Sequence, residues 1–403
     1  MINMKAEILQ KNTPKGWQRV KLGDISDITN GKTNTQDAVA DGEYPLFDRS
    51  VTIKRSNKYL FDKTAVILPG EGAEFVPRYY SGKFDLHQRV YAIFPGEVAD
   101  PLYLFQYLYT NREVFARNAV GSTVKSLRLP IIQAVDVLLP PLTEQKNIAE
   151  ILGVVDEQIQ KTEEIITSTK KLKKGLEQQL FTRGIGHMKF KKTKIGEIPE
   201  NWNVVTIRNS SIALIDGDRG VNYPKKDDFS ADGYCLFLSA KNVSKNGFVF
   251  EETSFISKEK DAALRKGKLE RGDIILTSRG TVGNIAYYHE RVPFNNIRIN
   301  SGMLIIRHGA QFDPLFLYKY LSGPQMAAKY LSMGSGSAQP QLPVGSLEQV
   351  EVPVPPISEQ KKISQMISDV DEKIQVNQKL KFKLIQLKQG LMQDLLTGKK
   401  RTI

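Results

Sequence analysis

The chain has 403 residues, of which 40% are hydrophobic and 25% charged, a composition typical of folded domains and unlike that of disordered or fibrous proteins. This length favours two or three domains, each able to bury its own core. The single cysteine, Cys235, allows no internal disulfide, and no apolar run approaches the roughly 20 residues of a membrane span. The start lacks a signal-peptide core, so we expect a soluble protein of the reducing cytoplasm.

The net charge of +13 is the most informative property of the composition. Lysine and arginine release condensed counterions from a polyanion, so nucleic acid is the leading class of partner. A basic surface can also serve solubility alone, so the charge needs support from motifs.

The first half of the chain begins with short β-rich runs, such as TAVILPG and RVYAIFPG, and continues with a helix around Leu102 to Asn118. Trp17 stands three residues after a proline, as Trp202 does in the second half. Core anchoring and base stacking are both open to these tryptophans, and anchoring is favoured. The mixture predicts an α+β domain over residues 1–142 with a twisted, partly antiparallel sheet.

A long helix is predicted next, over residues 143–184. A diproline precedes it, Thr143 offers a capping hydroxyl, and Glu144 suits the positive end of the helix. Apolar residues recur at steps of three and four, as in a coiled-coil seam. The predicted seam residues of this helix are Ile148, Leu152, Val155, Ile159, Leu172, Leu176 and Leu180.

After a linker over residues 185–200, the second half repeats the first. A second α+β domain over residues 201–357 contains GDIILTSRG, SGMLIIRHG and a helix around Leu315 to Leu331. A second long helix follows over residues 358–398, with Ser358 and Glu359 at its start. Its predicted seam residues are Ile363, Ile367, Val370, Ile374, Leu384, Leu387, Leu391 and Leu395.

The two long helices are copies of each other. PPLTEQKNIAEILGVVDEQIQ from Pro140 returns as PPISEQKKISQMISDVDEKIQ from Pro355, at an offset of 215 that holds through Leu180 and Leu395. PLYLFQYLYT from Pro101 likewise matches PLFLYKYLSG from Pro314. The whole half is therefore duplicated, and the second copy carries about 30 extra residues before its helix.

The connectivity predicts how the helices pair. A helix of nearly 40 residues runs to about 60 Å, too long for the interior of a compact domain. The first helix must lead from one domain to the other and the second must return, so we expect an antiparallel two-helix coiled coil with one recognition domain at each end and a pseudo-twofold repeat. The alternative is two helices that pack on separate domains without touching.

Several polar side chains suit recognition of base edges. Glutamine or asparagine can bond adenine bidentately, and arginine guanine, and the turn TSRGTVGN presents such groups. A plain solvated turn is the alternative. The predicted DNA-binding residues are Lys32, Arg49, Lys54, Arg55, Arg78, Gln88, Arg89, Lys125, Lys241, Asn242, Arg279, Thr281, Asn284, Asn295, Asn296, Arg298, Gln339 and Gln341. Nine lysines and arginines between Lys170 and Lys194 could contact phosphate or could complement the helix end.

We find no catalytic constellation in the sequence. His87, His187, His289 and His308 lie far apart without metal-ligand spacing, and one cysteine cannot build a zinc cluster. LPGEGAEF and TSRGTVGN do not fit a P-loop or a dinucleotide fingerprint. We therefore expect no catalytic residues and no metal site.

The arrangement resembles the specificity subunit of type I restriction and modification enzymes. The most specific pieces are PLTEQKNIAEIL with VDEQI, PISEQKKISQMI with VDEKI, and GDIILTSRGTVG, and the resemblance covers essentially the whole chain. The first half departs from the last phrase, since it has AVILPGEGAEF there. The resemblance implies a non-catalytic DNA-binding subunit of a restriction system, in which each target recognition domain reads one part of a bipartite target and the helices set the spacer.

The same resemblance implies partners and places the cofactors on them. Two methyltransferase subunits would bring S-adenosylmethionine for DNA methylation, and two restriction subunits would bring ATP and magnesium, so this chain would bind no cofactor itself. Two other functions remain open from the residues alone: a stand-alone sequence-specific DNA-binding regulator, and a coiled-coil interaction protein with no DNA role.

Overall fold

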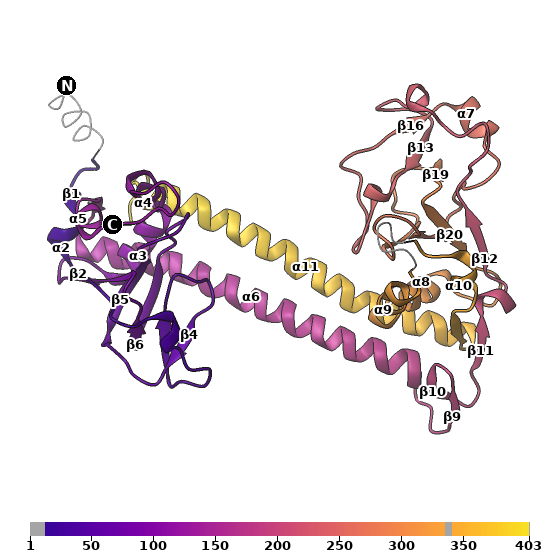
Figure 1. Ribbon diagram of the computed structural model, residues 1–403, viewed down its shortest axis with the longest axis horizontal. Coiled ribbons are helices and arrows are strands. Elements are labelled where there is room, and N and C mark those ends of the chain that lie inside the picture. Colours follow the sequence, from indigo (N-terminus) through magenta and orange to yellow (C-terminus); the bar gives the residue numbers. More distant parts are fainter. Residues whose placement is uncertain (1–12, 335–340, 403) are drawn as a thin grey trace. The chain divides into compact units, whose positions relative to one another are not determined.

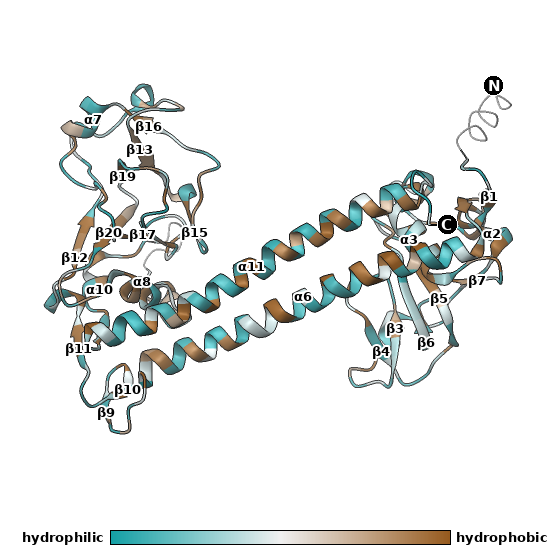
Figure 2. Ribbon diagram, turned by 180° about the vertical axis from the view of Figure 1, so that it is seen from behind, coloured by the Kyte–Doolittle hydropathy of each residue, from teal (hydrophilic) through white to brown (hydrophobic). Residues whose placement is uncertain are grey.

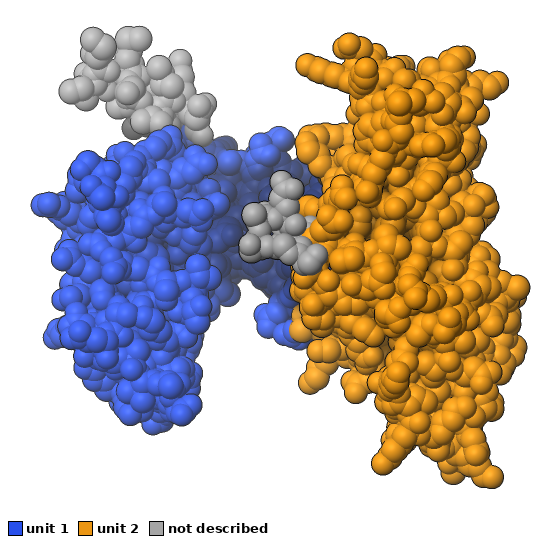
Figure 3. All heavy atoms as spheres, turned by 45° about the vertical axis from the view of Figure 1, so that its right-hand side comes forward, with its two compact units in different colours: residues 1–165, 377–403 blue, residues 166–376 orange. Residues whose placement is uncertain are grey.

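The computed structural model describes residues 13–334 and 341–402 (Figure 1). The chain divides into two compact units, drawn in two colours in Figure 3. The first unit contains the residues up to Ile165 together with those from Asn377 onward, and the second contains Ile166–Val376. Each long helix is therefore shared between the two units.

The first unit combines a six-stranded sheet, a two-stranded pair and short helices. Its elements are β1 (Gln18–Lys21), α2 (Leu22–Ile25), β2 (Ser26–Asn30), η1 (Thr35–Asp37), β3 (Tyr44–Phe47), β4 (Lys54–Ser56), β5 (Phe61–Pro69), β6 (Arg78–Leu86), β7 (Val90–Pro95), α3 (Pro101–Thr110), α4 (Glu113–Asn118), α5 (Leu129–Gln133), β8 (Asp136–Leu139) and the first part of α6 (Leu142–Arg183). The sheet order is β2-β7-β5-β6-β3-β4, antiparallel except where β3 runs parallel to β6. One core packs this sheet, α3 and the long helices together, with Tyr103, Ile148 and Leu395 among its buried residues.

The second unit repeats this plan with more residues. It contains the rest of α6, β9 (Phe190–Thr193), β10 (Gly196–Pro199), β11 (Asn203–Thr206), η2 (Ile207–Asn209), β12 (Ala213–Asp216), η3 (Lys226–Asp228), β13 (Cys235–Leu238), η4 (Ala240–Asn242), β14 (Val243–Ser244), β15 (Gly247–Phe248), β16 (Phe255–Ile256), α7 (Lys258–Ala263), β17 (Ile274–Thr277), β18 (Ile285–Tyr287), β19 (Ile297–Ile299), β20 (Met303–Arg307), α8 (Pro314–Ser322), α9 (Pro324–Met333), α10 (Val344–Glu348), β21 (Glu351–Val354) and the first part of α11 (Ile357–Leu395).

The registers identify corresponding strands in the two units. The four-stranded sheet β12-β20-β17-β18 matches β2-β7-β5-β6, and β13 runs parallel to β19 as β3 does to β6. The pair β11·β21 joins Asn203 to Val354 as β1·β8 joins Gln18 to Leu139. The mixed helix and strand content of both units confirms the α+β part of the predicted fold class. The second unit has β14, β15 and α7 as additional elements. Its sheet is divided into a four-stranded and a three-stranded part because residues 288–296 interrupt the strand that corresponds to β6, leaving β18 and β19.

Within each unit the two long helices run antiparallel. In the first unit Asp156 and Glu163 of α6 pair with Lys388 and Lys381 of α11, so residue numbers rise on one helix as they fall on the other. In the second unit Lys173 of α6 pairs with Asp371 of α11 at 2.7 Å. Hydrophobic residues recur between polar ones along both helices (Figure 2).

Most of the predicted seam is buried, but two leucines are not. Ile148, Leu152, Val155, Leu180, Ile363, Ile367, Ile374 and Leu395 are buried, and Ile159, Leu176, Val370, Leu384 and Leu391 are half-buried. Leu172 and Leu387 are 63% and 51% exposed, so placing them in the seam was wrong. Their neighbours Lys173 and Lys388 take the inward positions because each reaches an aspartate of the facing helix.

The predicted linker over residues 185–200 contains structure of its own. β9 and β10 pair antiparallel as a hairpin, with Phe190 opposite Pro199. Ile198 of this hairpin joins the core around Trp202 and Phe316. None of the helices in residues 13–334 and 341–402 has the length and hydropathy needed to cross a bilayer.

Candidate nucleic-acid interface

Charged residues lie together at the turn that follows β5, at one end of the central strands of the first sheet. Glu71 accepts from Arg49 at 2.5 Å through one carboxylate oxygen and lies 3.3 Å from Arg89 through the other. The Glu71 side chain is 16% exposed, whereas those of Arg49 and Arg89 are 48% and 60% exposed. The glutamate is therefore fully paired, and both guanidinium groups keep free faces toward solvent.

Arg89 stands on a tight turn between β6 and β7. The buried imidazole of His87 accepts the backbone N–H of Arg89 through Nδ1 at 3.0 Å. Burial and the nearby Arg49 hold the pKa of His87 below its usual range, which keeps the ring neutral and able to accept. The side chains of Asn30, Gln88 and Arg89 help to line a polar hollow of about 280 Å³ that also reaches Tyr91 and Ser126.

Arg49 belongs to a loop between β3 and β4 that is anchored by Asp48. This buried carboxylate accepts from the backbone N–H of Ser50 at 2.8 Å and from Lys54 at 2.8 Å. Burial acts to raise the pKa of Asp48, but the bonds from Lys54 and Ser50 outweigh it and the pKa is lowered. Arg78 donates to the carbonyl oxygens of Ser50 and Val51, which fixes the loop from the other side.

In the second unit the corresponding turn follows β17 and exposes Arg279 and Thr281. Gly280 and Gly283 have φ angles of +76° and +90°, a conformation that favours glycine, so the tight turn depends on them. The backbone N–H of Arg279 donates to the carbonyl of Gly302 at 3.1 Å, and the arginine is exposed. Asn284 lies deeper, because its side-chain amide donates to the carbonyl of Val243 at 2.8 Å.

The sequence interpretation missed Arg219 in the second unit. Asp218 accepts from the backbone N–H groups of Gly220 and Arg265, and these bonds lower its pKa to about 2. The next residue, Arg219, is half exposed and donates to the carbonyl of Ser301 at 3.3 Å. The match between DRSV from Asp48 and DRGV from Asp218 would not have located it, because Arg49 follows β3 whereas Arg219 follows β12, the counterpart of β2.

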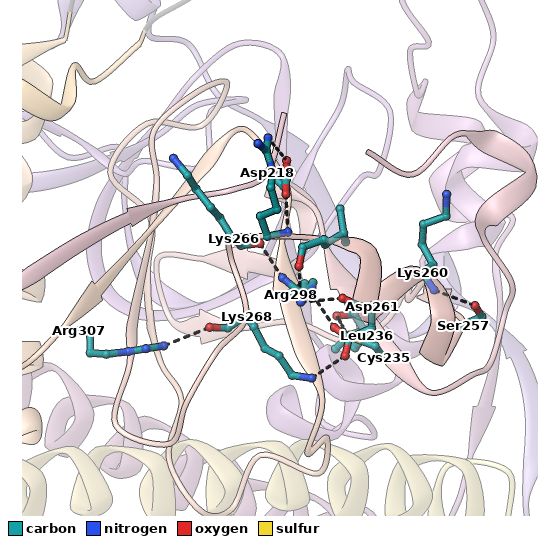
Figure 4. A network of polar contacts seen from close by, with 12 residues as sticks. Asp218, Cys235, Leu236, Ser257, Lys260, Asp261, Lys266, Lys268, Arg298 and Arg307 are labelled. Atoms are coloured by element: carbon teal, nitrogen blue, oxygen red, sulfur yellow. Dashed lines mark hydrogen bonds and ion pairs between the residues drawn. The ribbon is translucent and has the colours of Figure 1, made fainter. Parts of the chain in front are cut away.

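Arg298 is not available to DNA in this fold, contrary to the sequence prediction. It is 5% exposed, and it bonds the Asp261 carboxylate at 2.5 Å and the carbonyl of Lys266 at 2.7 Å (Figure 4). Lys268 closes the same network on Asp261. Burial acts to raise the pKa of Asp261, and the bonds from these two cations more than offset it. The arginine therefore joins β19 to α7 and supports the unit from within.

Asn242 is likewise a structural residue. It is 3% exposed, and its amide group donates to the carbonyls of Val249 and Glu252 and accepts from the backbone of Ser239. Every part of the amide is thus engaged inside the unit, because a buried amide needs such partners. The sequence prediction placed Asn242 at the DNA because of its polar side chain, and residue type alone gives no sign that this side chain is buried.

The other predicted residues divide by what they already bind. Lys32, Gln88, Lys125, Lys241, Asn295 and Gln341 are exposed, Asn296 is half-buried, and Gln339 lies outside the described residues. Arg55 donates to the carbonyls of Gly42 and Glu43, and Lys241 pairs with Glu252 at the surface. The candidate interface is therefore the turn after β5 in the first unit, with Glu71 and Arg89, and the turn after β17 in the second unit, with Arg279.

Both tryptophans anchor helix ends, as the favoured interpretation expected. Trp17 donates through Nε1 to Glu144 at 3.0 Å, and Trp202 donates to Glu359 at 3.0 Å. Glu144 also binds Arg401, while Glu359 also binds His187 at 2.8 Å. The first turn of each long helix thus holds the C-terminal end of the other helix within the same unit. Among the described residues no cluster of histidine, cysteine and acidic side chains could hold a metal ion.

Comparison with known proteins agrees with this architecture. The family described as type I restriction modification DNA specificity domain matches residues 14–171 and 199–386, one copy for each half of the repeat. The chain therefore belongs to this family, and the predicted identity as a specificity subunit that recognises DNA sequence is confirmed.

Individual relatives cover nearly the whole chain. The type I restriction enzyme MjaVIII specificity subunit of Methanocaldococcus jannaschii is 26% identical, over 96% of this chain and 94% of its own. The crystal structure of the S subunit from a type I system of M. genitalium has a TM-score of 0.64 at 18% identity, covering 95% of this chain and 96% of that one. A chain from a structure described as showing complex assembly of the type I system has a TM-score of 0.55 at 14% identity, covering 95% and 98%.

Proposed function

We propose that the chain is the non-catalytic DNA specificity subunit of a type I restriction-modification complex. The domain around residues 1–142 reads one half of a bipartite DNA target, and the domain around residues 201–357 reads the other. The observation that supports this most directly is the repeat itself, because two domains of one design present different side chains at corresponding turns. Two different half-sites are therefore expected.

The long helices are proposed to join into one antiparallel coiled coil that carries a reading domain at each end. The supporting observation is that the helix contacts repeat with the sequence: Lys173 binds Asp371 and Lys388 binds Asp156, each pair related to the other by the offset of 215. A rod of fixed length between two readers would set the number of unread base pairs between the half-sites.

The chemistry is proposed to reside on partners. Two methyltransferase subunits would dock on the helices and bring S-adenosylmethionine, and two restriction subunits would bring ATP and magnesium. The similar chain taken from a type I assembly supports association with such subunits. On this proposal the present chain binds no cofactor of its own and works in the cytoplasm, where it meets the DNA.

The test is to co-express the chain with the methyltransferase subunit expected among its neighbouring genes and to map modified adenines in genomic DNA. The expected result is one bipartite motif with a constant spacer, and no methylation when either protein is omitted. Methylation without sequence preference, or a motif unchanged after the chain is omitted, would refute the proposal.

Binding to duplex DNA at several salt concentrations supplies an independent check. Phosphate contacts predict a log-log slope of about −0.9 for each neutralised phosphate. A flat response would argue against any DNA-binding role.

A further inference from the structure

The turn after the central strand occupies the same place in both units. The N–H groups of Gly70 and Ser278 donate to the carbonyls of Arg89 and Gly302, both at 2.9 Å. The carbonyls of Gly70 and Ser278 accept from Leu127 and Leu342, both at 2.8 Å. The residues that follow, Glu71 and Arg279, each form an isolated bridge to the segment before the leucine. Position 71 therefore corresponds to position 279, and position 89 to position 302.

The side chains at these two positions differ between the units, and the arginine comes from opposite sides. The first unit has glutamate on the β5 side and arginine on the β7 side, whereas the second has arginine on the β17 side and glycine on the β20 side. Each unit therefore presents an exposed guanidinium group at this edge, supplied from opposite sides of the antiparallel pair. Sequence alignment of the two halves does not reveal this, because LPGEG and TSRGT have diverged.

The electrostatic balance of the edge is kept as well. In the first unit Glu71 is paired with Arg49 and Arg89, which leaves one net positive charge in that group. In the second unit Arg279 brings one positive charge and Gly302 none. Arg219, which donates to the carbonyl of Ser301, is paired with Asp216 at 3.5 Å, so one net positive charge remains there as well. Both carboxylate oxygens of Glu71 are occupied, so this group is poorly placed to accept from a base and well placed to hold the arginines.

We propose that Arg89 in the first unit and Arg279 in the second each read a guanine in the major groove, with Glu71 as a positioning residue for Arg89. A guanidinium fork matches the O6 and N7 acceptors of guanine, and a fixed orientation improves that match. Arg89 is favoured over Arg49 because it is the more exposed and lines the polar hollow together with Gln88. This inference rests on the proposed function, and it adds the residue and the base.

Methylation mapping with the complete chain and its methyltransferase partner tests the assignment. Arg89→Ala should lower the preference for one guanine in one half-site by about 10-fold or more and leave the other half-site unchanged. Arg279→Ala should do the same for a guanine in the opposite half-site. The matched controls are Lys21→Ala and Arg208→Ala, exposed cations paired at the surface far from these turns in sequence, which should leave the motif intact.

Glu71→Gln separates positioning from support of the fold. The expected result is a partial loss of preference at the guanine that Arg89 reads, with an unchanged melting temperature. An unchanged motif for Glu71→Gln would overturn the positioning role. A uniform loss of methylation at all sites in Arg89→Ala and Arg279→Ala, without a change of motif, would show phosphate contacts and overturn the base assignment. A wild-type complex without any motif would instead refute the proposed function.

Discussion

Each recognition domain is joined to the long helices through an aspartate, and the two aspartates have different neighbours. In the first unit Asp156 binds Lys388 and the neutral amide of Gln106, both with short contacts of 2.6 and 2.8 Å. In the second unit Asp371 binds two cations, Lys173 and Lys319, at 2.7 and 2.6 Å.

A second difference compensates for the first. Glu177 of the second unit lies 3.4 Å from Lys173, and the position 215 residues later is the buried, uncharged Met392. The first cluster thus contains one cation and one anion, and the second contains two of each. The two junctions therefore differ in polarity, but each carries no net charge, because an unbalanced charge is costly where it is partly removed from water.

The largest effect is expected from removing the second aspartate. Asp371→Ala leaves Lys319, whose side chain is 11% exposed, without its carboxylate, and should cost about 3 to 5 kcal/mol of local stability. Asp156→Ala removes the carboxylate from one cation, Lys388, and from an amide rather than from two cations, and should cost less, about 1 to 3 kcal/mol. Hydrogen exchange of the α8 and α3 peptides measures each junction separately. Equal losses of local stability in the two variants would contradict the difference between the two junctions.

Two leucines of α6 allow a buried and an exposed position of the same helix to be compared. Leu180→Ala removes a side chain that is 3% exposed and should cost about 2 to 4 kcal/mol. Leu172→Ala makes the same chemical change at a side chain that is 63% exposed and should stay within about 0.5 kcal/mol. Hydrogen exchange along residues 166–183 reports both. A large loss of stability in the Leu172→Ala variant would show that Leu172 does pack in the seam.

The helix ends predict a dependence on pH in the first unit. The bond from Arg401, and that from Trp17, hold the pKa of Glu144 below its usual value despite burial. A carboxyl group with a lowered folded-state pKa stabilises the fold above its unfolded pKa, and this contribution disappears as the pH falls through the folded-state value. Glu144→Gln should therefore cost about 1.5 to 2 kcal/mol near neutral pH.

The difference between Glu144→Gln and the parent should shrink to nothing in acid. Fluorescence-detected unfolding in a Trp202→Phe background follows Trp17 alone, since the chain has two tryptophans. A difference that stays constant down to pH 2 would exclude the ion pair as its cause.

Among the changes at the two junctions, the smallest effect is expected from giving the second junction the polarity of the first. The double variant Lys319→Gln, Glu177→Met keeps one cation and one anion, and should remain within about 1 kcal/mol of the parent. Lys319→Gln alone leaves an excess of negative charge and should cost more than the double variant. Exchange of the α8 peptide compares the two. A double variant less stable than the single one would show that neutrality is not the governing property.

The sequence predicted what depends on periodicity and repetition. The steps of three and four located both long helices to within a few residues, and the offset of 215 revealed the duplicated halves. It could not separate Leu172 from Lys173 as the inward residue, because an aliphatic lysine stem can cover the same surface when a carboxylate receives its end. That carboxylate, Asp371, lies on the other helix.

The candidate site was harder to predict, because residue type does not report burial or pairing. Arg298 lies within the short strand β19 and is held inside by Asp261, whereas Arg279 follows a β-rich run and is exposed on a glycine turn. Glu71 was overlooked because an acidic residue argues against DNA contact when it is considered alone. Its role depends on Arg49 and Arg89, which come from two other loops.

On the proposed function, the long helices set the distance between the two recognition domains, and an insertion into both helices tests this. Seven residues, two helical turns that keep the seam in phase, are inserted after Ile165 in α6 and after Val376 in α11. Mapping of methylated adenines should then show both half-sites unchanged and a spacer longer by up to about three base pairs, since seven residues add about 10 Å. An unchanged spacer with both half-sites still modified would contradict the claim.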